Sequence, residues 1–163
     1  KASMPSTLPT FALVTFDNLS GQRHAGEIMS GIFLTELINR GKIVAEPGTV
    51  RELFRSKNSA PRGKIDYELV SELKLNLGVD YVLTGSVNHF KAGIAGVESS
   101  APEIEFGGRC LDSGDGRTIA AYGCFRHGSD SDALLSFGST NALGELSQKV
   151  INDFLNKLDK DIN

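Results

Sequence analysis

The sequence predicts an α/β fold, with one mixed five-stranded sheet, helices packed on the sheet faces, and the element order β-α-β-α-α-β-β-β-α. Short apolar runs bounded by turn residues alternate with segments of helical period, and two alternating runs flank a glycine-containing turn. The chain has 163 residues, of which 40% are hydrophobic, and this is enough for one buried core. We therefore expect a polar tether at residues 1–9 and a single domain at residues 10–163.

The first three elements are a strand, a helix and a second strand. Phe11–Phe16 is an almost continuous apolar run, typical of a strand covered on both faces. Turn-forming residues follow at Asp17–Gly21. Apolar spacing then becomes helical from about Ala25 to Arg40, before a brief strand at Ile43–Glu46.

Two more helices are expected before the third strand. Thr49 and Glu52 form a capping-box pattern that would open a short helix, and a polar loop follows at residues 56–64. The second of these helices is expected at Asp66–Leu77, and the third strand at Tyr81–Phe90. Since helical crossovers join parallel strands, the first three strands should be largely parallel.

The last two strands should form a hairpin around the turn residues Asp112–Arg117. Pairing of the two turn ends places Cys110 opposite Ile119 and Cys124 opposite Glu105, so the two sulfurs point to opposite sides of the sheet. A one-residue bulge would bring them to one side but about 13 Å apart, which is too far for a disulfide. We expect two free thiols.

The same register predicts which side chains share a face of the hairpin. Tyr122 would lie across from Gly107 on the second face, where an aromatic ring commonly covers a strand glycine. A last helix is expected at about Ala142–Leu158. The predicted apolar face consists of Ile104, Phe106, Gly108 and Cys110 beside Ile119, Ala121, Gly123 and Phe125.

Charge and motif content argue against several classes of function. The 17 Lys and Arg oppose 20 Asp and Glu without a basic cluster, so no nucleic-acid partner is expected. No apolar run approaches the ~20 residues of a membrane-spanning helix. His24, His89 and His127 lack the spacing of metal ligands, and no catalytic set emerges. We expect a protein that is not an enzyme and uses no cofactor or metal.

One loop suggests an alternative. Gly21 and Gly26 frame a G-x-x-x-x-G pattern between a strand and a helix, where a phosphate-binding loop would lie. Glu27 and Ile28 replace the expected Lys and Ser or Thr, and Glu27 also suits the positive end of a helix dipole. A small-ligand or nucleotide-binding α/β protein using Asp17–Gly26 is the alternative function.

Ile94 and Val97 are apolar residues in a glycine- and serine-rich connection at Lys91–Pro102. Such residues either contact a partner or fold back on the sheet edge. Together with Tyr122, they are the candidate partner-contact residues.

The chain resembles the CsgG-like curli-secretion lipoprotein family, the related amino-terminal domain of TolB, and penicillin-binding-protein activator lipoproteins. The matching segments are Phe11–Ser20, Leu34–Leu37, Ile43–Leu53, Leu77–Val87 and Arg109–Ile119, of which Gly78–Ser86 is the most specific. The resemblance covers about residues 10 to 158.

This resemblance implies a periplasmic bacterial domain, in some members an outer-membrane lipoprotein anchored by a lipid on an upstream cysteine. No leader stands in this chain, which fits either a cytosolic protein or a mature piece, and the resemblance favours the second. Members act through protein contacts in envelope assembly, secretion or activation of a partner, and an oligomer is possible. Secretion channels carry two membrane-crossing hairpins, whereas Lys91–Pro102 and Gly128–Asn141 lack the alternating strands for them, so no pore is expected.

Overall fold

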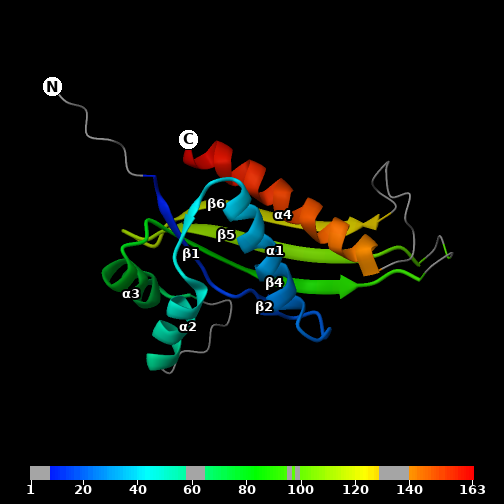
Figure 1. Ribbon diagram of the computed structural model, residues 1–163, viewed down its shortest axis with the longest axis horizontal. Coiled ribbons are helices and arrows are strands. Elements are labelled where there is room, and N and C mark those ends of the chain that lie inside the picture. The colour runs from blue at the N-terminus through cyan, green and yellow to red at the C-terminus, as the bar shows by residue number, and fades with distance from the viewer. Residues whose placement is uncertain (1–7, 58–64, 95–96, 98–99, 129–139) are drawn as a thin grey trace.

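The computed structural model describes residues 8–57, 65–94, 97, 100–128 and 140–163 (Figure 1). It confirms the predicted fold class, a mixed sheet with helices packed on it. The predicted tether lies largely outside the described residues, as do residues 129–139. The elements are β1 (Thr10–Leu13), β2 (Asp17–Asn18), α1 (Ala25–Asn39), β3 (Ile43–Val44), α2 (Pro47–Ser56), α3 (Tyr67–Leu77), β4 (Tyr81–Lys91), β5 (Glu103–Asp112), β6 (Thr118–His127) and α4 (Thr140–Ile162).

The sheet has the strand order β3-β1-β4-β5-β6. β1 is parallel to both β3 and β4, and β5 and β6 extend the sheet as an antiparallel meander, as expected. The first apolar run, however, is not one strand. β1 ends at Leu13, and Asp17–Asn18, predicted as a turn, forms the short strand β2 beside Ser86 and Val87. The chain leaves the ladder between β1 and β2, where Ser30 Oγ accepts a hydrogen bond from Phe16 N at 2.8 Å.

The main core lies between one face of the sheet and the helices α1 and α4, which lie side by side over it (Figure 1). Four buried phenylalanine rings form its centre, with centroid distances of 5.0 to 6.3 Å between neighbours. They are Phe16, Phe33 on α1, Phe106 on β5 and Phe154 on α4. Gly108 admits this packing, because a Cβ at that position would stand 2.5 Å from the Phe154 ring.

The helices α2 and α3 cover the opposite face of the sheet, but only at one end. Phe54 and Leu73 pack there against Val82 and Leu111. The predicted capping box at Thr49 is wrong, because α2 begins earlier, at Pro47. Proline presets the backbone angle of a first helical position, and the Glu46 carboxylate accepts a hydrogen bond from Thr49 N at 2.7 Å.

A bulge in β6 changes the predicted faces of the hairpin. Asp112 N donates to Arg117 O as expected, but the register shifts by one residue, so that Cys110 pairs with Ala120 and not with Ile119. A single extra residue turns all later side chains of a strand to the other face. Tyr122 consequently lies opposite Gly108, not Gly107, and faces the main core. The expectation of two free thiols is confirmed.

A polar network ties the end of α1 to α4. Arg40 donates to Asp159 Oδ2 at 2.9 Å, and Lys42 Nζ lies 2.6 Å from Asp159 Oδ1. Burial opposes ionisation of Asp159, but the hydrogen bonds and charges of Lys42 and Arg40 outweigh it, so the pKa of Asp159 lies below its usual value.

Gly108→Ala is expected to destabilise the protein by about 1–3 kcal/mol, because Phe154 is held among other rings and cannot move aside freely. Gly107→Ala is the matched control on the same strand, since a Cβ there meets only Ser86 Oγ, at 3.9 Å. Urea unfolding of both variants tests this. Equal stabilities would contradict the packing role of Gly108.

Asp159→Asn is expected to lower the melting temperature at pH 7. A carboxyl whose pKa is depressed by folding stabilises the protein above the unfolded pKa, which is about 3.9 for Asp, and this contribution is lost as the pH falls through the folded pKa. The variant and the parent should therefore converge in acid. Asp161→Asn, in an i,i+4 pair with Lys157, serves as the control and should change little.

A candidate interaction face on the sheet

Part of the second sheet face has no helix packed on it in the described ranges of the chain. Beyond the area covered by α2 and α3, alternate residues of β4, β5 and β6 point away from the main core. We call this surface the open face. It consists of Ser86 and His89 on β4, Glu105, Gly107 and Arg109 on β5, and Ala121, Gly123 and Phe125 on β6.

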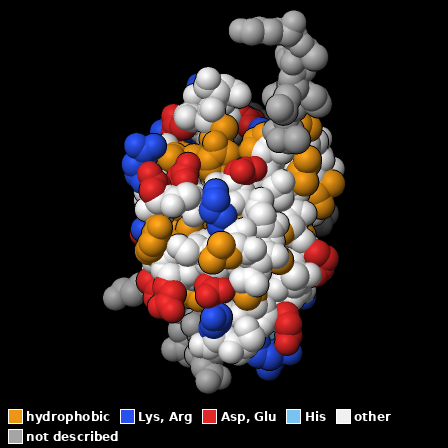
Figure 2. All heavy atoms as spheres, turned by 90° about the vertical axis from the view of Figure 1, so that its left-hand side faces the viewer, with side chains coloured by type: hydrophobic (Ala, Val, Ile, Leu, Met, Phe, Trp, Pro, Cys, Tyr) orange, Lys and Arg blue, Asp and Glu red, His pale blue; other side chains and the backbone are white. Residues whose placement is uncertain are grey.

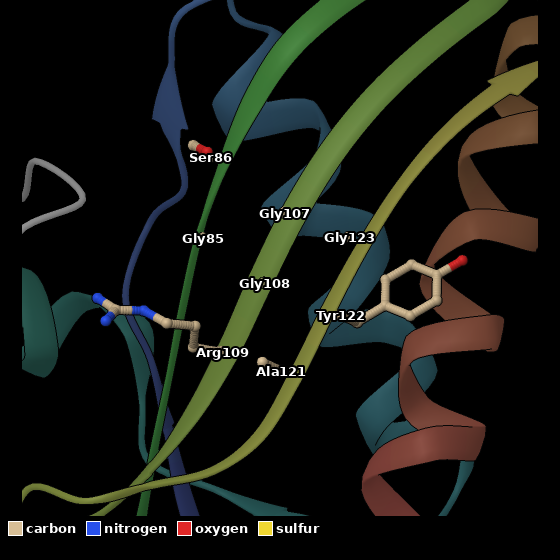
Figure 3. Close-up of a pocket in the computed structure, with 8 residues that line it drawn as sticks. All are labelled: Gly85, Ser86, Gly107, Gly108, Arg109, Ala121, Tyr122 and Gly123. Atoms are coloured by element: carbon tan, nitrogen blue, oxygen red, sulfur yellow. The ribbon is translucent and has the colours of Figure 1, made fainter.

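A shallow hollow of about 530 Å³ lies in the middle of this region. Ser86, Gly107 and Gly123 form one row across the three strands, and their small side chains account for the depression. Figure 3 shows the Arg109 side chain extending over β4, while the Tyr122 ring points the other way, toward α4.

Opposite charges flank the hollow along β5, with Arg109 in its lining and Glu105 beyond it. Arg109 and Glu105 lie two residues to either side of Gly107, so they stand about 13 Å apart along β5. Both side chains are exposed, and within the described part of the chain neither has a hydrogen bond or an ion pair. Two unpaired, opposite charges thus flank a nearly flat glycine floor.

An aromatic ring and a histidine lie beside Glu105 on the neighbouring strands. Phe125 is 58% exposed, and its ring centroid lies 6.1 Å from that of His89. His89 Nε2 is 2.9 Å from Glu103 Oε2, and His127 Nε2 is 3.6 Å from Glu103 Oε1. These contacts fix the end of the sheet beside the open face.

The structure brings the three predicted contact residues to different places. Ile94 and Val97 lie in the β4–β5 connection and are 63% and 45% exposed, so neither folds back on the sheet. Tyr122 instead stacks on Phe154 beneath α4, with centroids 5.7 Å apart and an interplanar angle of 11°. Its ring therefore contributes to packing.

The cysteines and Tyr122 are poor nucleophiles. Burial, followed by the charge of Asp112, raises the pKa of Cys110 to about 12. Burial is also the main cause that raises the pKa of Cys124, and it raises the pKa of Tyr122 to about 12 with a further contribution from the neighbouring Cys124. Among the described residues, no group of three or more His, Cys, Asp or Glu is arranged to hold a metal ion.

In the loop predicted as an alternative ligand site, polar groups form hydrogen bonds to one another within the loop. Asn18 Oδ1 accepts from Ser20 N and Oγ, and Asn18 Nδ2 donates to Gln22 O at 2.6 Å. Gly26 is explained by packing, because a Cβ there would collide with the carbonyl oxygen of Phe16. The glycine spacing thus has a structural cause, and the loop geometry does not favour a nucleotide.

On the side of the molecule with α3 and the carboxyl terminus, acidic and basic side chains alternate with apolar ones (Figure 2). No large single-sign patch covers that view. Of the helices in the described ranges, none has both the length and the hydropathy of a bilayer-spanning segment.

Sequence reasoning missed the open face because of the bulge. Ala121, Gly123 and Phe125 were predicted to face the core, and the register shift turns them outward. The sequence did indicate that Arg109 and Glu105 share the polar face of their strand, since both alternate with apolar residues along β5. What the alternation could not show is that none of the described helices packs over them.

Comparison with solved structures finds this fold in bacterial proteins of low sequence identity. The PelC dodecamer from Paraburkholderia phytofirmans has a TM-score of 0.57 at 20% identity, over 96% of this chain and 93% of that chain. Lipoprotein GNA1162 from Neisseria meningitidis has a TM-score of 0.60 at 19% identity, over 91% and 99%. The LpoB C-terminal domain from Salmonella enterica has a TM-score of 0.55 at 10% identity, over 75% and 86%.

The chain therefore has the α/β fold seen in these proteins. No family model matches the sequence, and a search of curated proteins gives no significant match. The resemblance to lipoproteins, including LpoB, is thus supported at the level of fold. The curli-secretion and TolB parts of that resemblance stay predictions.

We expect both thiols to be unreactive toward Ellman's reagent in the native protein, because burial disfavours their thiolate forms. In denaturant two thiols per chain should react rapidly. A fast-reacting native thiol that disappears in Cys124→Ser or Cys110→Ser would contradict the burial of that residue.

Proposed function

We propose that this chain is a non-enzymatic protein-interaction domain of the bacterial cell envelope. It would act in the periplasm, as part of a lipoprotein, in envelope assembly, secretion or activation of a partner. The observation that carries this proposal is the unequal use of the two sheet faces. One face is filled by α1 and α4, whereas the other is covered by α2 and α3 at one end and, among the described residues, carries no further helix beyond them.

The fold neighbours support the same setting. One is a lipoprotein, and another assembles as a dodecamer. The sequence resemblance adds an extracytoplasmic location and action through protein contacts. Among these functions, assembly with other proteins agrees best with an exposed, rigid sheet surface.

Ile94 and Val97 are proposed as a partner contact. Two exposed aliphatic side chains stand within four residues of each other in the β4–β5 connection. Ile94 N donates to Ser100 O at 2.8 Å, and Ser100 N donates to Val97 O at 2.9 Å, so backbone hydrogen bonds hold both residues. A held apolar pair loses less conformational freedom on binding than a free one.

A photocrosslinking amino acid placed at Ile94 or Val97 of the full-length protein should give a discrete adduct with an envelope protein in living bacteria. Leu75, 81% exposed on α3, is the matched apolar control and should not give that adduct. The same adduct from all three positions would contradict a specific contact. A thermal shift of several degrees with one ligand of a nucleotide and metal panel would favour the alternative at Asp17–Gly26.

A further inference from the structure

We infer that the open face pairs with the open face of a second copy of this chain, through a two-fold axis along the row of Gly107 and Gly123. The inference rests on the proposed function only in that the domain works through protein contacts.

The glycines of the floor are the first observation. A glycine inside a strand weakens it and often marks the close approach of another backbone. Gly85 and Gly108 are explained within the chain, since a Cβ at either would collide with neighbouring atoms of the sheet or core. Gly123 has nothing within 4 Å and Gly107 only Ser86 Oγ at 3.9 Å. The packing of a single copy does not require these two glycines.

The order of charges along β5 is the second observation. Arg109, Gly107 and Glu105 follow each other on one face as positive, small and negative. A two-fold axis through Gly107, perpendicular to the strands and parallel to the sheet, reverses this order in the second copy. Arg109 of each copy then faces Glu105 of the other. The face is complementary in charge to itself, as an isologous interface requires.

The order of side-chain sizes along β6 fits the same operation. Two small residues, Ala121 and Gly123, and the large Phe125 follow each other beside the charged residues of β5. The axis that joins Arg109 to Glu105 also places Phe125 of one copy over Ala121 of the other. The hollow beside Gly123 can then receive that ring, which is 58% exposed in the single chain. The charges along β5 and the side-chain sizes along β6 therefore favour the same two-fold arrangement.

The dimensions are compatible with such a pair. Face-to-face sheets pack about 10 Å apart, a gap that an arginine and a glutamate side chain can bridge together. α2 and α3 cover this face only at the end beyond Arg109, so they do not lie on the three rows that would meet. Each dimer would contain two Arg109–Glu105 pairs and two seated Phe125 rings.

Light scattering and sedimentation velocity over a micromolar to near-millimolar concentration series would test this. The chain should show a concentration-dependent mass approaching twice 17.5 kDa. Arg109→Glu and Glu105→Arg should each weaken self-association at least about tenfold, because each dimer then holds two repulsive pairs. Lys149→Glu, an exposed charge reversal on α4, is the control and should leave association unchanged.

Two rescues make the test specific to this geometry. A mixture of Arg109→Glu with Glu105→Arg should form a heterodimer, since both cross-pairs become attractive, and the double variant should again self-associate. Gly123→Trp should block pairing by filling the hollow, with circular dichroism and melting temperature confirming its fold.

A chain that stays monomeric throughout the concentration series would overturn the inference. So would an assembly that survives both charge reversals, or reversals without rescue. Adducts from Ile94 and Val97 alongside a monomeric chain would leave the proposed function standing and reject only the self-pairing.

Discussion

The cluster of phenylalanine rings between the sheet and its two long helices is the contact on which the rest of the structure depends. Phe33 and Phe154 come from α1 and α4, and Phe16 and Phe106 come from the sheet side. Offset and tilted rings at these distances add to the free energy of burial. The cluster draws both helices onto one face of the strands, and Gly108 gives Phe154 the space to reach them.

Because both long helices pack on one face of the sheet, the described helices that cover the other face are the two short ones. The shorter helices α2 and α3 bury Val82 and Leu111 at one end, and the residues of β5 and β6 that face the same side beyond that point are charged or small, apart from Phe125. An antiparallel ribbon can face solvent on one side, whereas the parallel strand β1 is covered on both faces. The open face therefore follows from how the apolar residues are distributed between the two ends of the sheet.

Local patterns in the sequence predicted many of the helix ends and strands of this fold. Asp66 and Gly78 delimit α3 as an N-cap and a left-handed C-terminal residue with φ 64°, and Gly41 follows α1 with φ 72°. Local sequence patterns did not give the correct result at two places, the start of α2 and the faces of β6. At the start of α2, Pro47 and the Glu46 carboxylate prevailed over the pair Thr49 and Glu52. In β6, one bulged residue near Ile119 reversed every face assignment after it.

The fold class, the parallel and antiparallel parts of the sheet and the free thiols could be predicted from the sequence, because periodicity and turn chemistry act over a few residues. The strand order, the position of β2 and the identity of the open face become known from the three-dimensional structure alone. These depend on which side of the sheet each helix occupies, and that is set by contacts between residues far apart in the chain. Phe125 and Tyr122 illustrate the difference: they are three residues apart in one strand, yet one faces solvent and the other lies beneath α4.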